Sequence, residues 1–261
     1  MTGRATRLVM NRRHHRSRAV ARFLWASATA ATLVILTAAG ARTAECPDMP
    51  EPQIPTASTP LNIDAVKSQL RTYRQFVYMT DLARTFAIAR AYVERRAGEV
   101  QKPAVVLDID ETSVSNWRAI DLDDFGFIDK GKCTEDPGFA CGFSEWVGMA
   151  KAPAIEPALG LYNAAQGKGV AMFFITGRRD SQRDVTVKNL TDVGYRNWER
   201  LLTRPDGDTN PSIVPFKSSE RAKIAQDGYR IIATIGDQDS DLAGGSADCG
   251  FKVPNPFYFI P

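Results

Sequence analysis

Two patterns of hydrophobic residues alternate along the chain. Over residues 62–98, apolar side chains return every three or four positions, which predicts a long helix with a break near residues 79–81. Shorter apolar runs predict buried strands at 104–109, 170–176, 198–204 and 230–236. Helical patterns between them predict helices at 156–167, about 180–193 and about 218–227. Strands that alternate with helices predict an α/β fold, a parallel sheet with helices on both faces.

The segment between the first two predicted strands departs from this alternation. Residues 113–155 show no clean period and are rich in glycine, proline and aromatic residues, so we predict a cap inserted after the first strand. Its aromatic side chains would form either a wall that stacks part of a substrate or a small core inside the cap. They are Trp117, Phe125, Phe127, Phe139, Phe143 and Trp146. Three acids, Asp121, Asp123 and Asp124, fit a solvated turn better than a second cation site.

The N-terminal residues differ in composition from the rest. Seven arginines and no acid lie within residues 1–22, and residues 23–41 carry no charge. A basic head before an apolar stretch with small residues at its end is typical of a secretory signal, so we expect cleavage after residue 41 and export to the periplasm or the medium. The alternative is an uncleaved membrane anchor. The proline-rich residues 42–60 predict an extended arm, and residues 61–261 form the folded domain.

Loss of the leader changes the charge and removes both histidines. The chain has 33 basic and 30 acidic residues, and without the seven arginines 26 basic residues face 30 acids, a net charge of −4. Such a chain is not basic enough to predict binding of nucleic-acid polymers. The two histidines are His14 and His15, so histidine nucleophiles and imidazole metal sites are excluded from the mature chain. Its chemistry must come from carboxylates, lysine, hydroxyls and hard metal ions.

All four cysteines lie beyond the leader. An even number of cysteines in an exported chain favours disulfides, and three pairings are open. We favour Cys133 with Cys141, which closes a short loop, and Cys46 with Cys249, which ties down the N-terminal arm.

Polar residues gather where the predicted strands end. The first strand ends in three acids, Asp108, Asp110 and Glu111. The other groups are Thr176, Gly177 and Arg178 after the second strand, Lys217 just before the helix that leads to the fourth, and Asp237 and Asp241 after the fourth. Each group alone would be an ordinary turn. Because the carboxyl ends of parallel strands meet at one edge of a sheet, together they predict a ligand site.

These residue types suit phosphoryl transfer, which needs an in-line nucleophile, neutralisation of charge and positioning. One carboxylate is able to attack phosphorus, and a second carboxyl to protonate the leaving oxygen and later activate water. An extended strand would not place both carboxyls correctly around one phosphate group, so the backbone must bend between Asp108 and Asp110. Magnesium prefers oxygen ligands, and hydroxyl, backbone N–H and lysine groups bind phosphate oxygens. Arg178 is also placed to contact phosphate, whereas Arg179 is interpreted as a surface residue.

The same segments resemble the haloacid dehalogenase superfamily, specifically its subfamily IIIB acid phosphatases. The matching stretches are VVLDIDETSVSN, FFITGRR, FKSSER, GYRIIATIGDQDSDL and FKVPNPFYFIP, within residues 60–261. The resemblance implies a Rossmann-like core that binds Mg²⁺. It also implies that Asp108 is the nucleophile and a metal ligand, that Asp110 is the acid/base with its carbonyl on the metal, and that Asp237 is the third protein ligand. By the same resemblance, Asp241 holds a metal-bound water or supports Lys217, Lys217 steadies the nucleophile and the phosphate, and Thr176 and Gly177 bind phosphate.

We therefore predict an exported, Mg²⁺-dependent acid phosphatase that acts on small organic phosphomonoesters, nucleotides among them, through an aspartyl-phosphate. The alternatives are a phosphotransferase on the same scaffold and a non-catalytic storage or binding protein. Some plant storage proteins of the family lack the nucleophilic aspartate, and this chain retains Asp108, which favours an enzyme.

Overall fold

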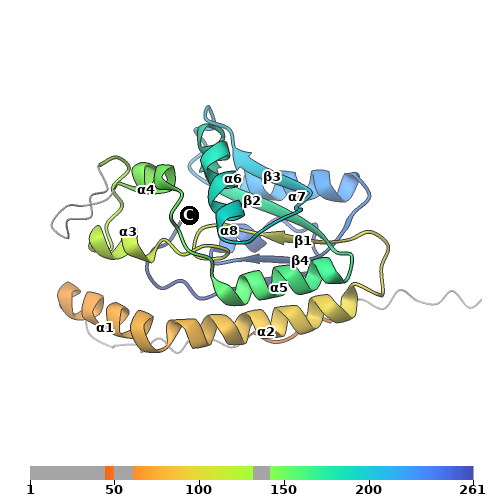
Figure 1. Ribbon diagram of the computed structural model, residues 1–261, viewed down its shortest axis with the longest axis horizontal. Coiled ribbons are helices and arrows are strands. Elements are labelled where there is room, and N and C mark those ends of the chain that lie inside the picture. Colours follow the sequence, from red (N-terminus) through yellow and green to blue (C-terminus); the bar gives the residue numbers. More distant parts are fainter. Residues whose placement is uncertain (1–44, 50–60, 132–141, 261) are drawn as a thin grey trace, which may run out of the picture. The chain divides into compact units, whose positions relative to one another are not determined.

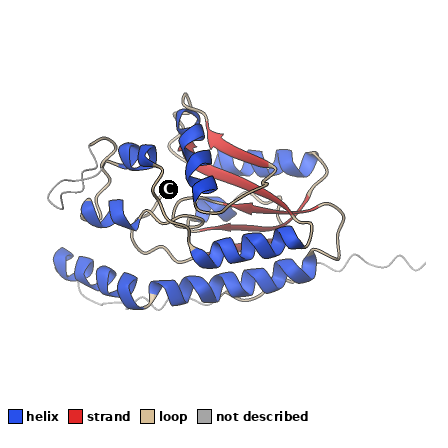
Figure 2. Ribbon diagram, viewed as in Figure 1, coloured by secondary structure: helices blue, strands red, loops and turns tan. Residues whose placement is uncertain are grey.

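A parallel five-stranded sheet forms the centre of the unit Thr43–Pro261 in the computed structural model, which describes residues 45–49, 61–131 and 142–260 (Figures 1 and 2). The strands are β1 (Pro103–Leu107), β2 (Ala171–Arg179), β3 (Arg200–Arg204), β4 (Arg230–Gly236) and β5 (Cys249–Lys252). Their order is β3-β2-β1-β4-β5, and all neighbours are parallel. The chain leaves β1 toward β2 and returns to its other side as β4, so a switch point lies beside β1. The predicted α/β fold is confirmed.

Alternating side chains on the strands build a core on each face of the sheet. Val105 and Leu107 pack in one cluster with residues of α2 (Tyr78–Arg96) and α5 (Glu156–Gly167), which lie side by side on that face (Figure 1). Ala104 and Val106 pack on the opposite face with Ile224 of α7 (Val214–Gln226). The period of two explains this division, and burial on both faces explains why the strands read as continuous apolar runs.

Most predicted helix and strand bounds lie within a few residues of the observed ones, with two differences that matter. The long N-terminal helix divides at Val77, between α1 (Ile63–Phe76) and α2, rather than at residues 79–81. Helix α7 begins at Val214, four residues before its predicted start, so Lys217 lies inside the helix rather than before it. Pro215 in the first turn explains the early start, because its missing N–H would have no partner there.

Strand β5 was not predicted from the sequence. It has four residues, of which Cys249 and Phe251 are buried while Gly250 and Lys252 are exposed. Pairing with β4 and a disulfide from Cys249 to Cys46 hold it at the edge of the sheet. The favoured pairing of Cys46 with Cys249 is confirmed, whereas the predicted partners Cys133 and Cys141 lie outside the described residues.

The segment between β1 and α5 contains two short helices, α3 (Trp117–Leu122) and α4 (Phe143–Met149). The acids at the end of α3 are exposed, as expected of a solvated turn, with 41% of the Asp121 and 58% of the Asp124 side chain accessible, and both pair with cations of α1. Arg71 of α1 donates to Asp121 (2.7 Å) and Asp124 (2.9 Å), and Lys67 also pairs with Asp124. These ion pairs tie α3 to α1, and because they are exposed each contributes little, about 0–1 kcal/mol.

The aromatic residues of this segment divide into two groups. The Trp117 ring contacts Phe125 and Phe257, with centroids 5.9 and 5.0 Å away, and Trp146 is buried. These residues form a small core, one of the two expected arrangements. Phe127 is 79% exposed beside Phe143 and remains available to a ligand. Phe139 lies outside the described residues.

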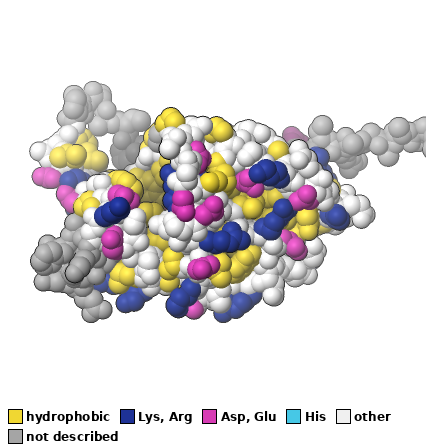
Figure 3. Space-filling model, turned by 90° about the horizontal axis from the view of Figure 1, so that it is seen from above, with side chains coloured by type: hydrophobic (Ala, Val, Ile, Leu, Met, Phe, Trp, Pro, Cys, Tyr) yellow, Lys and Arg dark blue, Asp and Glu magenta, His cyan; other side chains and the backbone are white. Residues whose placement is uncertain are grey.

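The predicted leader, residues 1–41, and most of the arm, residues 42–60, also lie outside the described residues. Within the described ranges, no helix combines the length and the apolar character that crossing a membrane requires. On the face seen in Figure 3, basic and acidic side chains are interspersed.

Candidate active site

Asp108 stands directly after β1, at the carboxyl edge of the sheet. Its backbone N–H donates to the Ile235 carbonyl of β4 (3.0 Å), and its own carbonyl accepts from the Ser113 hydroxyl (2.6 Å). The residue is buried. Burial raises the pKa of the Asp108 carboxyl, the nearby Asp241 adds to the rise, and Lys217 opposes it. A neighbouring cation is therefore needed to keep this carboxylate charged.

Lys217 supplies that cation from the first turn of α7. Its ammonium donates to Asp108 Oδ1 (2.7 Å) and to Asp241 Oδ1. Burial lowers the pKa of Lys217, but the two carboxylates outweigh burial and leave the pKa above its ordinary value. Lys217 thus stays protonated and fixes the rotation of the Asp108 carboxylate.

Asp237 and Asp241 come from the chain that follows β4. Asp241 lies in α8 (Asp239–Leu242), and its Oδ2 accepts the Gln238 N–H (2.9 Å). Gly236 makes this fold possible, because a Cβ at that position would lie 2.2 Å from Asp241 side-chain atoms. The last residue of the strand must therefore be glycine if Asp241 is to turn back toward Lys217.

Asp237 is held by donors from three segments. Its Oδ1 accepts from the Thr112 hydroxyl (3.1 Å), and its Oδ2 accepts from the amides of Gln238 (2.6 Å) and Asn255 (2.7 Å). Burial raises the pKa of Asp237 to about 6 and Asp241 adds to the rise, whereas the Asn255 and Gln238 amides lower it. The two amides occupy one oxygen and leave Oδ1 the more accessible to a further partner.

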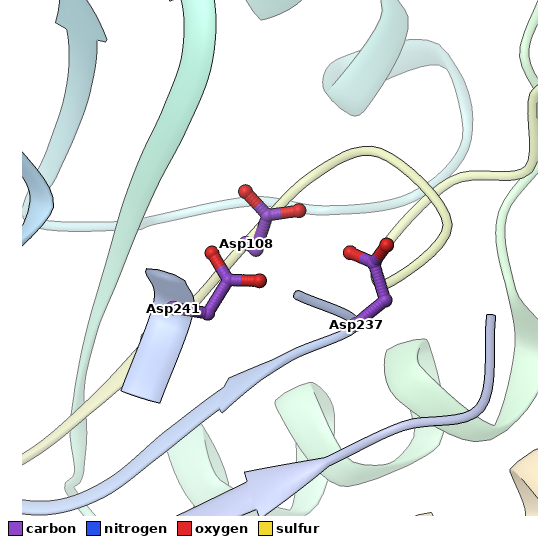
Figure 4. Close-up of side chains that lie close together, drawn as sticks. All are labelled: Asp108, Asp237 and Asp241. Atoms are coloured by element: carbon purple, nitrogen blue, oxygen red, sulfur yellow. The ribbon is translucent and has the colours of Figure 1, made fainter. Parts of the chain in front are cut away.

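The carboxylates of Asp108, Asp237 and Asp241 fit a divalent metal ion. Each offers an oxygen within 4.8 Å of the others, from the loops after β1 and β4 (Figure 4). Among the described residues, Lys217 is the cation that pairs with this group, through Asp108 and Asp241, so three buried carboxylates share one positive charge. Buried excess charge is costly unless it is paired or binds a metal. All donors are oxygens, which a hard cation such as Mg²⁺ prefers.

The chain bends sharply after Asp108, as predicted. The Ile109 carbonyl accepts the N–H groups of Ser113 and Val114, both at 2.9 Å, and Glu111 adopts a φ of 55°. Such a left-handed conformation is uncommon for a residue with a Cβ and is seen often at functional sites. The bend sends the Asp110 carboxylate to Arg178 and away from the cluster around Lys217.

Asp110 forms an ion pair with Arg178. The guanidinium Nη2 lies 2.7 Å from Asp110 Oδ1, and the Arg178 side chain is 1% exposed. Because β2 continues to Arg179, Thr176 and Gly177 lie within the strand, and the Thr176 hydroxyl accepts the Arg178 N–H (3.1 Å). Phosphate binding by Thr176, Gly177 and Arg178 stays a prediction. Arg179 is more than a surface residue, since it donates to the carbonyls of Pro205 and Asp208, both at 2.9 Å.

Sequence reasoning missed the residues that surround these acids. Glu111 is buried and accepts from Asn116 and from the Tyr258 hydroxyl (2.9 Å). Burial and the neighbouring Asp110 raise the pKa of Glu111 to about 8, while the hydrogen bonds from Asn116 lower it. Asn255 and Tyr258 both belong to the C-terminal tail. The one available signal was that a third acid followed Asp108 and Asp110 at the end of a buried strand.

Comparison with known proteins identifies the family. The model of the HAD superfamily, subfamily IIIB (acid phosphatase), matches residues 54–261. Acid phosphatase 1 of Solanum lycopersicum is 34% identical over 164 residues, which are 62% of this chain and 61% of that protein. The stem 28 kDa glycoprotein of Glycine max is 35% identical over 175 residues, 66% of each chain. The chain thus spans somewhat less than two thirds of the length of these curated relatives.

A solved structure shares the fold. The class C acid phosphatase from Bacillus anthracis superposes with a TM-score of 0.58 at 20% identity, over 76% of this chain and 86% of that one. The family model covers the whole sheet and every acid described above, and we conclude that the chain belongs to the HAD superfamily, subfamily IIIB (acid phosphatase).

Proposed function

We propose that this protein is an exported acid phosphatase that hydrolyses small organic phosphomonoesters, nucleotides among them, through an aspartyl-phosphate on Asp108. The observation that carries the proposal is the buried contact between Asp108 and Lys217, with Asp237 and Asp241 within ligand distance. A carboxylate whose rotation is fixed by a lysine suits nucleophilic attack, because the lysine also attracts the phosphate oxygens.

The reaction would proceed in two steps. An oxygen of Asp108 attacks phosphorus, the bond from phosphorus to the ester oxygen breaks, and Asp110 gives its proton to that oxygen. A water molecule then gives a proton to Asp110 while its oxygen attacks phosphorus and breaks the bond to Asp108. Inorganic phosphate leaves, and both carboxyl groups return to their starting states. Thr176 and the Gly177 N–H would bind the remaining phosphate oxygens.

Asp108, Asp237 and the Asp110 carbonyl would hold the metal ion, for which we propose Mg²⁺. When bound, the ion neutralises phosphate charge and supports the in-line geometry. Both oxygens of Asp241 are engaged, by Lys217 and by the Gln238 N–H, which supports a role in holding Lys217 rather than direct ligation.

Export is supported by the disulfide between Cys46 and Cys249, since such bonds persist in oxidising compartments. Relatives named vegetative storage protein or stem glycoprotein keep a storage role as the alternative. The two functions differ in a simple assay.

The test is phosphate release from 4-nitrophenyl phosphate by the purified protein, with Mg²⁺, with a chelator, and with Asp108→Asn. We expect both the chelator and the substitution to lower kcat by about 1000-fold or more, because the nucleophile and its ion act as a unit. Asp239→Asn is the matched control, because Asp239 begins α8, between Asp237 and Asp241, but its side chain is 72% exposed, and the activity of this variant should equal that of the wild type. Absence of activity on a broad panel of phosphomonoesters, from protein shown to be folded, would exclude the phosphatase and favour storage or binding.

A further inference from the structure

Asn116 is a buried residue that links Asp110 to the segment between β1 and α5. It is 1% exposed and immediately precedes α3. Its side-chain Nδ2 donates to Asp110 Oδ1 (2.8 Å) and to Glu111 Oε2 (3.0 Å), and its backbone N–H donates to Glu111 Oε1. Its Oδ1 accepts from Trp146 Nε1 of α4 (2.8 Å). Every polar group of the side chain is therefore satisfied inside the protein.

The orientation of the Asn116 amide is set by its neighbours. An indole nitrogen only donates, so the amide oxygen must face Trp146, and this turns the NH₂ group toward Asp110 and Glu111. A reversed amide would place a donor against the indole N–H. The network thus has one arrangement that satisfies all of its members.

Asn116 does not serve the helix that it precedes. Asparagine at this position commonly accepts an N–H from the first turn, yet the Asn116 side chain makes no such cap. Its amide turns away from α3 and toward the carboxylates. A helix-capping role therefore does not explain the residue.

Donors converge on one oxygen of Asp110. Oδ1 accepts from Asn116 Nδ2 (2.8 Å), just before α3, and from Arg178 Nη2 (2.7 Å) of β2. Oδ2 contacts, among the described residues, the Arg178 Nε at 3.2 Å, a nitrogen that it shares with Oδ1. Arg178 alone would contact the Asp110 carboxylate from one side. The second contact, from Asn116, fixes the orientation of the carboxylate plane.

We propose that Asn116 is a positioning residue for the acid/base Asp110: it keeps Oδ2 turned toward the leaving oxygen and, through Trp146, couples this orientation to α4. The inference rests on the proposed function, in which Asp110 protonates the leaving group. An alkoxide leaving group is strongly basic and needs that proton, whereas 4-nitrophenolate is a stable anion and needs it little. Misplacement of Asp110 should therefore affect alkyl phosphates selectively.

The experiment compares kcat/KM for glycerol 2-phosphate and 4-nitrophenyl phosphate in the Mg²⁺-loaded protein. For Asn116→Ala we expect a fall of about 10–100-fold on the alkyl ester, since small misplacements of a catalytic group reach that size, and a fall of about threefold or less on the aryl ester. Trp146→Phe keeps a ring but removes the donor to Asn116. It should lower the ratio of kcat/KM for the alkyl ester to kcat/KM for the aryl ester, as Asn116→Ala does, but by a smaller factor. Asp110→Asn removes the acid itself, so it should give the largest change in this ratio.

Tyr258→Phe is the matched control, because it removes a hydrogen bond to Glu111 and leaves the Asn116 contacts in place. It should change both substrates by the same factor. Equal losses on the two esters in Asn116→Ala and Trp146→Phe would overturn the inference, and if Asn116→Ala does not fold, Trp146→Phe decides. A wild-type protein that hydrolyses neither ester would instead overturn the proposed function.

Discussion

Two charged clusters lie at the same edge of the sheet and differ in their balance of charge. Around Asp108, three buried carboxylates lie together with one cation, Lys217, which contacts Asp108 and Asp241. Around Asp110, its carboxylate faces one guanidinium, that of Arg178, and the neighbouring Glu111, whose pKa is raised to about 8, is neutral below that pH. The first cluster carries a negative excess that a metal ion would relieve, and the second carries none. In the proposed reaction, the metal ion and the nucleophile therefore lie in the cluster around Asp108, and proton transfer takes place in the cluster around Asp110.

The bend at Ile109, between Asp108 and Asp110, is what separates the clusters. Asp108 and Asp110 are two residues apart, and in a straight strand they would share one face of the sheet. The turn closed on the Ile109 carbonyl directs them to different partners instead. Two acids of the same type thus come to lie in different environments, which is how one site assigns them different roles.

The largest effect is expected from removing the cation of the first cluster. Lys217→Met leaves the buried carboxylates of Asp108 and Asp241 without their ammonium partner, and breaking such a buried pair costs about 3–5 kcal/mol of unfolding free energy. Loss of one electrostatic contact to the phosphate should lower kcat by about 100–1000-fold. Urea unfolding and steady-state kinetics measure the two effects.

Lys223→Met is the control for that change, because Lys223 lies on the same helix in an exposed pair with Glu220. It should be close to neutral in both measurements. Equal stability and equal kcat in Lys217→Met and Lys223→Met would show that the excess negative charge around Asp108 affects neither property.

A smaller effect should follow from loosening one ligand of the same cluster. Asn255→Ala removes one of the two amides that hold Asp237 Oδ2, and loss of such a supporting contact weakens metal binding by about 10-fold or more. Titration calorimetry with Mg²⁺ and no substrate measures this directly. Asn62→Ala, which removes the cap of α1, should leave the affinity unchanged. An unchanged affinity in Asn255→Ala would show that the tail does not support the metal site.

The smallest effect on activity is expected at the disulfide. Replacing Cys46 and Cys249 by serine opens a link between residues 203 positions apart, which the chain-entropy model values at about 5 kcal/mol. The melting temperature should fall by about 10 °C or more, while kcat well below it stays the same, because neither cysteine contacts either charged cluster. Thermal unfolding and kinetics on the same sample test this. A folded variant with a lowered kcat would contradict this expectation and show that the position of β5 affects the active site.

The pattern of apolar and polar residues was enough to predict the sheet and the edge at which the acids meet. Apolar runs marked β1, β2 and β4 because strands buried on both faces carry mostly apolar residues, and the acids then follow at the strand ends. Parallel connectivity brings these ends to one edge, so Asp108, Asp110 and Asp237 were predictable as neighbours. The short elements were not: β5, α3 and α4 are too brief to form by local preference and depend on packing against the rest.

Which charged groups pair with one another could be read from the folded structure but not from the sequence. Lys217 and Asp108 are 109 residues apart, and Asn255 reaches Asp237 from a tail with no local sign of that contact. Arg178 was equally plausible as a phosphate ligand, but in the folded chain its guanidinium pairs with Asp110. Residue types and strand periods carry information about what is buried and where the chain turns. The partner of a buried charge is set by distances across the fold, because electrostatic and hydrogen-bond energies depend on geometry within a few ångströms.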